Sequence, residues 1–276
     1  MNSNLFEFAN KGNILVFAGA GVSAGQPSSL PTWKTLATSI AFELCNHLES
    51  DLNRPDWLIN VKKLIESSSK INRFPPEYQA QLLEEMSGEL YFKALQSIDI
   101  GIINENHYNI AKLAKRGAIK AIVTTNFDRL IEKALDQQDV KYEVAYEDNG
   151  YKATIRRLQN DKDHSLQIIK LHGCVSDHLS MIDTLKQRKL GRSNLIKECL
   201  QPLFDKYWIY LGFSAADLDG NPKYLGLQEG ASKSLGSTYV SYPGNPTLSK
   251  GAELLMRAYG GRGDVIVCLL YTSRCV

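Results

Sequence analysis

Four short apolar runs, each ending in small or polar residues, constrain the fold of this chain more than any other feature of its sequence. The first run, residues 13–18, leads directly into Gly19-Ala20-Gly21, where the backbone can approach a ligand with no side chain in the way. The other three runs cover residues 119–125, 167–171 and 208–212. We predict that all four are strands of one sheet.

The segments between these runs carry helical patterns. Apolar residues recur at helical spacing over residues 33–48 and, more briefly, over several other segments, which include 5–11, 127–135, 195–203 and 252–259. Further strands are predicted at 142–145, 237–242 and 264–267. Strands that alternate with helices predict an α/β fold, a Rossmann-like parallel sheet with helices on both faces.

Residues 50–117 interrupt this alternation, since they contain helical patterns near 58–65, 78–90 and 104–115 but no convincing strand. We predict an all-helical insertion of about residues 50–117 that caps one edge of the sheet, within a single domain of residues 1–267. Residues 268–276 resemble translated adaptor or vector sequence, so we expect them to be a scar, with the natural protein continuing beyond.

Composition excludes several classes of partner. The chain has 32 Lys and Arg residues against 30 Asp and Glu residues, so we expect no nucleic-acid binding. No apolar run approaches the roughly 20 residues that a membrane helix needs. The first residues lack the basic and apolar regions of a signal peptide, which predicts a cytoplasmic protein.

The five cysteines do not form a metal or disulfide pattern. None lies in a C-x-x-C pair, so we expect no zinc, and an odd count without a secretion signal argues against a disulfide framework. Cys45 and Cys199 are predicted to be small buried apolar residues on helices.

The predicted strand ends bring chemically useful residues to one edge of the sheet. In open α/β sheets, ligands bind outside the carboxyl ends of the strands. We therefore expect glycine turns, an amide, a carboxylate and an imidazole to lie close together at this edge. The residues are Gly19, Ala20, Gly21, Asn126, Asp128, His172, Gly212 and Ser214.

Each of these residues also has a purely structural interpretation. The glycine loop is also consistent with a tight turn that binds nothing, and Asn126 or Asp128 with an N-cap. His172 is also consistent with a neutral core imidazole. Ser214 fits a helix cap, and Asp217 fits a partner for the dipole of the same helix. The remaining histidines are assigned no role: His47, His107, His164 and His178.

The glycine spacing disfavours an ordinary dehydrogenase. It is Gly-x-Gly-x-x-x-Gly, one residue longer than the usual dinucleotide fingerprint. The acidic residue expected about 20 positions later should end a second strand, whereas Glu43 falls in a predicted helix.

The combination of these motifs resembles the sirtuin family over about residues 12–267. It consists of Gly19-Ala20-Gly21-Val22-Ser23, Thr124-Thr125-Asn126-Phe127-Asp128, Leu171-His172-Gly173 and Gly212-Phe213-Ser214. The resemblance implies a Rossmann-like domain that consumes NAD as a substrate. It implies that Gly19, Ala20, Gly21 and Ser23 contact the phosphates, and that Thr125, Gly212 and Ser214 contribute to NAD binding. It also implies that Asn126 and Asp128 surround the nicotinamide ribose and that His172 is the base.

Two departures separate this chain from protein-deacylating sirtuins. The loop after the first motif is Gly25-Gln26-Pro27-Ser28-Ser29-Leu30, where deacylases carry Gly-x-Pro-Asp-Phe-Arg, and the zinc pairs after His-Gly are missing. In these respects the chain is similar to divergent bacterial sirtuin-like proteins that hydrolyse NAD in anti-phage defence.

The expected activity is therefore NAD glycohydrolysis, with Asn126, His172 and Asp128 as catalytic residues. NAD-dependent deacylation and a non-catalytic module that senses NAD or ADP-ribose are the alternatives. We also expect a homo-oligomer, and restraint released by a phage-derived trigger or a C-terminal domain.

Overall fold

The computed structural model describes residues 5–49, 74–160, 165–191, 193–221, 223–241 and 248–267. These residues form a seven-stranded sheet in the order β3-β4-β2-β1-β5-β6-β7, and every pair of neighbours runs parallel. The strands are β1 (Ile14–Ala18), β2 (Ile119–Thr124), β3 (Tyr142–Ala145), β4 (Leu166–Lys170), β5 (Tyr207–Leu211), β6 (Gly236–Ser241) and β7 (Gly263–Val267). The predicted α/β class with a parallel sheet is confirmed.

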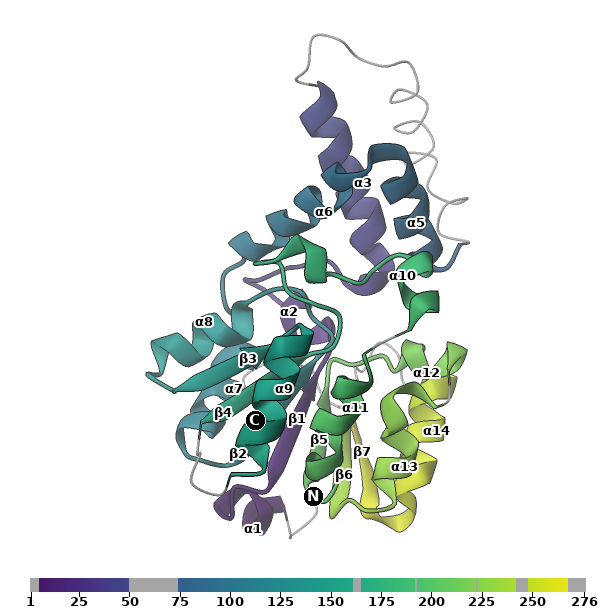
Figure 1. The fold of residues 1–276 in the computed structure, drawn as a ribbon. Helices are drawn as coiled ribbons and strands as arrows, with labels where there is room; N and C mark the ends of the chain where they lie inside the picture. The colour runs from purple at the N-terminus through teal and green to yellow at the C-terminus, as the bar shows by residue number, and fades with distance from the viewer. Residues whose placement is uncertain are drawn as a thin grey trace.

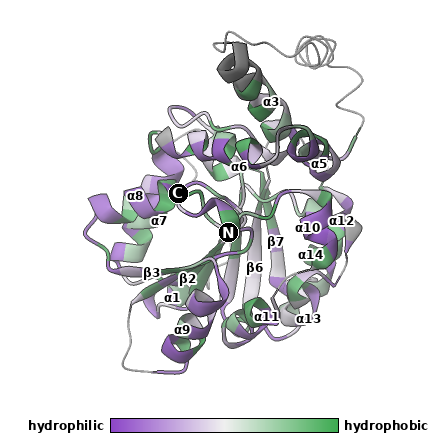
Figure 2. Ribbon diagram, turned by 45° about the horizontal axis from the view of Figure 1, so that its top comes forward, coloured by the Kyte–Doolittle hydropathy of each residue, from purple (hydrophilic) through white to green (hydrophobic). Residues whose placement is uncertain are grey.

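Helices cover both faces of this sheet (Figure 1). On one face lie α1 (Leu5–Asn10), α7 (Glu105–Lys115) and α8 (Leu130–Gln137). The other face carries α9 (Asp148–Leu158), α11 (Asn194–Leu200), α12 (Ala216–Gly220), α13 (Leu227–Ala231) and α14 (Lys250–Tyr259). Figure 2 shows both hydrophilic and hydrophobic turns on α9, α11 and α14, as expected for helices with one face on a sheet.

Burial on both faces explains the unbroken apolar sequence of β1. Leu15 and Phe17 point into one core, and Ile14 and Val16 point into the other. Because successive side chains of a strand alternate between faces, a strand that is covered twice needs apolar residues at every position.

A separate helical layer lies above the sheet in Figure 1 and is built from α3 (Trp33–Glu49), α5 (Pro76–Ser87) and α6 (Glu89–Leu95). It has its own core, in which Leu36 and Ile40 pack with Tyr91 and Leu95. Phe127, Val175 and Met181 belong to the same core, so the layer rests on the loops that follow β2 and β4. Below we call α3, α5 and α6 the helical layer.

Several short helices were not predicted. They are α2 (Gly21–Ala24), the 3-10 turns η2 (Gln96–Ile100), η3 (His178–Ser180), η5 (Tyr224–Gly226) and η6 (Gly260–Arg262), and the helices α9, α10 (Leu185–Leu190) and α13. Most have fewer than two turns, too short for a helical repeat of apolar residues to appear. The turn η4 (Gln201–Leu203) lies within the predicted helical segment 195–203, and α12 is the helix expected after Ser214. The predicted helix 127–135 instead begins at Leu130, because the side chain of Asp128 accepts the first backbone N–H.

Two further predictions lie outside the described residues. These are the helix near 58–65 and the scar at 268–276. The boundaries of the helical insertion stay a prediction, although α7, at its end, packs against α8 on the sheet rather than within the helical layer. Cys199 is buried on α11, as predicted, whereas the side chain of Cys45 on α3 is not among those described.

Candidate functional site

The floor of the site is a contact between two glycine turns at the ends of β1 and β5. A Cβ on Gly19 would lie 2.5 Å from the carbonyl oxygen of Gly212, and one on Gly21 would lie 2.8 Å from the Cα of Gly212. Gly212 has a φ of +58°, a conformation that residues with side chains rarely adopt. The contact therefore requires glycine on both strands.

The N–H groups of this turn are already engaged. Gly19 donates to the carbonyl of Leu211 and Gly21 to that of Gly212, each at 2.9 Å. These two glycines thus bring the ends of β1 and β5 together. That they also contact the phosphates of a nucleotide stays a prediction. Ser23, on α2, uses its side chain in the network described next.

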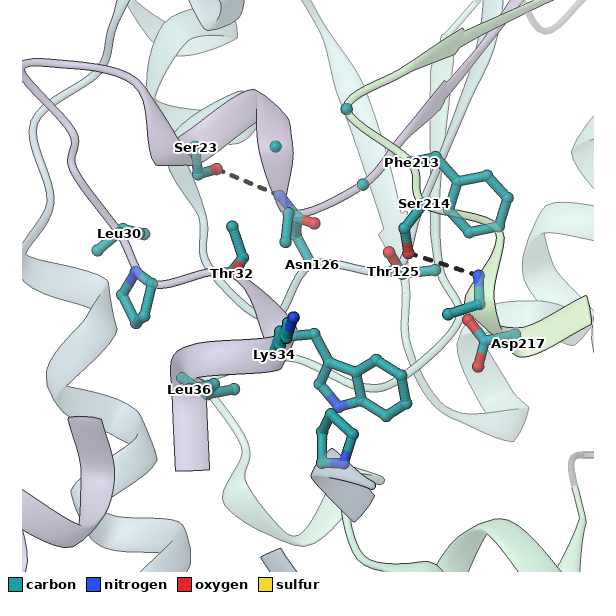
Figure 3. Close-up of a pocket in the computed structure, with 18 of the residues that line it drawn as sticks. Ser23, Leu30, Thr32, Lys34, Leu36, Thr125, Asn126, Phe213, Ser214 and Asp217 are labelled. Atoms are coloured by element: carbon teal, nitrogen blue, oxygen red, sulfur yellow. Dashed lines mark hydrogen bonds between the residues drawn. The ribbon is translucent and has the colours of Figure 1, made fainter. Parts of the chain in front are cut away.

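Ser23 connects the glycine turn to the end of β2. Its hydroxyl accepts from Nδ2 of Asn126 at 3.2 Å and donates to Oδ2 of Asp128 at 3.0 Å. Figure 3 shows Ser23 and Asn126 facing each other across this bond. The other oxygen of Asp128 accepts the N–H of Leu130 at 3.0 Å, so it is Asp128 rather than Asn126 that bonds the first N–H of α8, although the N-cap position itself is Arg129.

Asn126 is thereby left with an unused acceptor. Its Oδ1 is buried and has no hydrogen-bond partner among the described residues. A buried amide oxygen without a partner is unfavourable by about 1–3 kcal/mol. A ligand hydroxyl or a water at this point would relieve that penalty, and Asn126 lines the pocket in which such a ligand would lie.

A histidine that sequence analysis left without a role completes the network. Nε2 of His107, on α7, lies 3.0 Å from the Ser23 hydroxyl, and its Nδ1 accepts the N–H of Asn104 at 3.1 Å. A neutral ring therefore carries its proton on Nε2 and donates to Ser23. Burial lowers the pKa of His107 from 6.5 to about 4, although Asp128 opposes the shift. The Asn-x-x-His spacing at the start of α7 is the local signal, since each side chain caps the other's backbone.

His172 follows β4 and faces the opposite side of the pocket. It is 5% exposed, and the ring of Phe127 lies 6.3 Å from the imidazole, centroid to centroid. Its Nε2 is 2.9 Å from the hydroxyl of Tyr224 and 3.9 Å from Oδ1 of Asp217. Tyr224 comes from the short turn η5, and no sequence pattern marked it.

The third wall comes from the loop after β5. Ser214 accepts the N–H of Ala216, the first residue of α12, at 3.4 Å, and it also lines the pocket (Figure 3). The N-cap of α12 is Ala215 and not Ser214. Asp217, in the first turn of α12, lines the pocket too and accepts from Nη1 of Arg188 at 2.6 Å. Thr125 is a further lining residue, with its N–H bonded to the carbonyl of Ala18.

Together these walls enclose a pocket of about 650 Å³ at the carboxyl ends of the central strands. The sheet order changes direction at β1, with β2 on one side and β5 on the other, which is where open α/β sheets bind ligands. The pocket brings together all ten predicted site residues, Gly19, Ala20, Gly21, Ser23, Thr125, Asn126, Asp128, His172, Gly212 and Ser214. Residues of α3, including Trp33 and Leu36, close it from the side of the helical layer.

A fully buried lysine holds the loop that carries Asn126 and Asp128. Nζ of Lys170, at the end of β4, pairs with Glu132 at 3.0 Å and donates to the carbonyls of Asp128 at 2.5 Å and Asn126 at 3.4 Å. Burial opposes the charged form, yet the neighbouring carboxylate of Glu132 and further negative groups raise the pKa of Lys170. One cation thus joins β4, α8 and the loop between β2 and α8.

No group of three or more His, Cys, Asp or Glu side chains suited to a metal occurs in the part of the chain that the structure describes. Cys174 and Cys199 are free thiols there. The expectation of no zinc remains a prediction. Within the same part of the chain, no helix is both long and apolar enough to cross a bilayer.

The chain is similar in sequence to several known proteins. A family model described as a SIR2-like domain matches residues 120–254. NAD(+) hydrolase ThsA of Bacillus cereus (strain MSX-D12) is 27% identical over 209 residues, which are 74% of this chain and 38% of that protein. NAD(+) hydrolase ThsA of Acinetobacter baumannii (strain 532279) is 28% identical over 212 residues, 74% of this chain and 37% of that protein. The chain therefore spans well under half the length of these relatives.

The fold has a counterpart among solved structures. A structure described as "Structural Basis for the Mechanism and Regulation of Sir2 Enzymes" aligns with a TM-score of 0.50 at 16% identity, over 98% of this chain and 94% of that chain. At this identity the likeness extends to the fold alone.

The buried histidine predicts a pH-dependent stability. Because the pKa of His107 is lowered from 6.5 to about 4, the unfolded chain binds its proton at a higher pH than the folded chain. Neutral His107 contributes stability that is present above pH 6.5 and is lost as the pH falls through about 4, on the order of 3 kcal/mol. Urea unfolding at about pH 7 and about pH 4.5 should show a smaller difference in His107→Gln than in the parent. His178→Gln is the matched control, and an unchanged difference in His107→Gln would contradict the assignment.

The buried pair of Lys170 and Glu132 predicts that a second substitution restores stability lost by the first. Lys170→Met leaves Glu132 buried and unpaired, so we expect a loss of about 3–5 kcal/mol in the free energy of unfolding. Lys170→Met combined with Glu132→Met removes both charges and should recover most of that loss. Chemical denaturation of the three proteins measures both effects. A double variant no more stable than Lys170→Met would show that the pair is not the cause.

Proposed function

We propose that this chain, which carries a SIR2-like domain, hydrolyses the bond between nicotinamide and ribose in NAD+ and releases nicotinamide and ADP-ribose. The observation that carries the proposal is the buried, unpartnered Oδ1 of Asn126, which lies in the same pocket as His172. The two relatives reported above are named NAD(+) hydrolases, which supports the same substrate.

The proposed chemistry follows from the charge that develops as the bond breaks. Loss of nicotinamide builds positive charge on the ribose, as in glycoside hydrolysis. Asn126 Oδ1 would accept a ribose hydroxyl or orient water, and the carboxylate of Asp128 would favour the positive charge. His172 would take a proton from the attacking water or the ribose, which requires the neutral imidazole.

The glycine turn and the loop after β5 would receive the rest of the nucleotide. Gly19, Ala20, Gly21 and Ser23 are proposed to face the pyrophosphate, with Thr125, Gly212 and Ser214 completing the NAD site. Glycine at these positions lets the two turns meet, and the strand ends that they join line the pocket. The helical layer would limit the access of bulk water.

In the cell, the proposal places this activity in anti-phage defence by depletion of NAD. Such an activity must be restrained in its host, so we propose a homo-oligomer, with release by a phage-derived trigger or by a further domain.

The decisive experiment measures nicotinamide release by chromatography from purified protein and NAD+, without any acylated peptide. Turnover is expected in the parent protein, and loss of at least 100-fold in Asn126→Ala and in His172→Ala. Asn160→Ala and His178→Ala are matched controls from the surface turn after α9 and from η3. Full activity in both site variants would refute the assignment.

Two other outcomes separate the alternatives. Turnover that needs an acetylated peptide would indicate an NAD-dependent deacylase. Tight binding of NAD or ADP-ribose without turnover, even with an activating partner present, would indicate a sensing module.

A further inference from the structure

Asp217 is the acidic group found against the imidazole of His172. Its Oδ1 lies 3.9 Å from Nε2, and the side chains of Asp217 and His172 are 10% and 6% exposed. At this distance and burial, a carboxylate favours the protonated form of a histidine. A base that accepts a proton during the reaction proposed above would therefore be sensitive to the charge of Asp217.

That charge is opposed by a cation from a different element. Nη1 of Arg188, on α10, donates to the same Oδ1 at 2.6 Å, and the Arg188 side chain is 15% exposed. Asp217 thus stands between an arginine and a histidine, and its field at His172 depends on how closely Arg188 approaches. Asp217 lies closer to Arg188, at 2.6 Å, than to His172, at 3.9 Å.

The position of Arg188 depends on the helical layer. Its guanidinium lies over the ring of Trp33 of α3, 4.2 Å from the centroid. Nε1 of that ring donates to Asp183 at 3.1 Å, and Tyr91 of α6 donates to the other oxygen of Asp183 at 2.5 Å. The start of α10 is bound to α5 as well, through the N–H of Lys186 and Oε1 of Gln81 at 3.0 Å.

The other described groups near His172 differ from Asp217 in kind or in their partners. From η5 the hydroxyl of Tyr224 contacts Nε2, and from the loop after β2 comes the apolar ring of Phe127. Two other charged side chains line the pocket, Asp128 and Lys34. The oxygens of Asp128 are bonded to Ser23 and Leu130, and Lys34 lies on α3.

We propose that Arg188 and Asp217 set the proton affinity of His172, so that α10 couples the helical layer to the catalytic base. Arg188 and Asp217 act through His172 and are positioning residues. Withdrawal of Arg188 from Asp217 would increase the proton affinity of the imidazole. A displacement of the helical layer would change the activity at a given pH without altering any residue proposed to contact NAD+. This inference rests on the proposed NAD+ hydrolysis for its kinetic test.

The test compares the acid limb of the pH profile of kcat/KM for NAD+ in the parent and two variants. Asp217→Asn removes the negative charge, so His172 stays neutral to lower pH and the limb should move down by about one pH unit. Arg188→Met leaves Asp217 uncompensated, so the limb should move up by a similar amount. If the pair of Arg188 and Asp217 only held α10 and α12 together, the two substitutions would not displace the acid limb in opposite directions.

Three further variants make the test specific. Arg188→Lys keeps the charge and should restore the limb toward its position in the parent. In an Asp217→Asn background, Arg188→Met should move the limb much less than it does alone. Arg157→Met breaks the surface pair with Glu143 and should leave the limb in place. If Arg188→Met does not fold, Arg188→Gln takes its place, with thermal unfolding as the check.

A second measurement does not require turnover. The ring resonance of His172, assigned by its loss in His172→Ala, can be titrated by NMR in each variant, and its midpoint should move as the kinetic limb does. Titration shifts without any nicotinamide release would refute the proposed hydrolysis and keep the electrostatic coupling. Midpoints that stay fixed, or that move the same way in Asp217→Asn and Arg188→Met, would overturn the coupling itself.

Discussion

The site depends on a contact between two backbones. The turns after β1 and β5 meet at Gly19, Gly21 and Gly212, where atoms approach so closely that a single Cβ would collide with main-chain atoms. Backbone cannot move aside as the end of a side chain can, so the contact fixes the two strand ends rigidly. The depth of the pocket, the position of Ser23 and the start of α12 all follow from it.

Next to this rigid floor, the protein buries charged side chains as well as apolar ones. One face of the sheet is aromatic, with Phe17 and Phe213 in contact at 4.4 Å between ring centroids and Tyr210 stacked on Phe213. Below the loop that carries Asn126 and Asp128, Lys170 and Glu132 are buried as a pair instead. A dry aromatic core stabilises without directing any group, whereas a buried ion pair fixes which carbonyls face it. The aromatic core therefore contributes mainly to stability, whereas the buried ion pair fixes the position of the loop that carries Asn126 and Asp128.

The sequence was sufficient to predict the sheet and the residues at its edge, because a strand buried on both faces must be apolar throughout and must stop where polar residues begin. Asn126 and His172 were found in this way. It could not choose between Asn126 and Asp128 as the cap of α8, since either fits the local pattern and only the position of Leu130 decides. His107 and Tyr224 were not identified as site residues from the sequence, for a different reason. Their partners lie far away in the chain, at Ser23 and His172. The Asn-x-x-His spacing marks the cap at the start of α7, but it does not encode the contact between His107 and Ser23.

The order of strands has a consequence for how the domain matures. β1 lies between β2 and β5, so Ile14 pairs with Ile119 on one side and with Tyr207 on the other. Contacts that join such distant positions form late in folding, because the intervening chain must first lose its freedom. During synthesis the ribosome must therefore release most of the domain before the two glycine turns can meet. A nascent or truncated chain has no assembled pocket, and the topology delays the formation of the pocket until both partner strands of β1 are present.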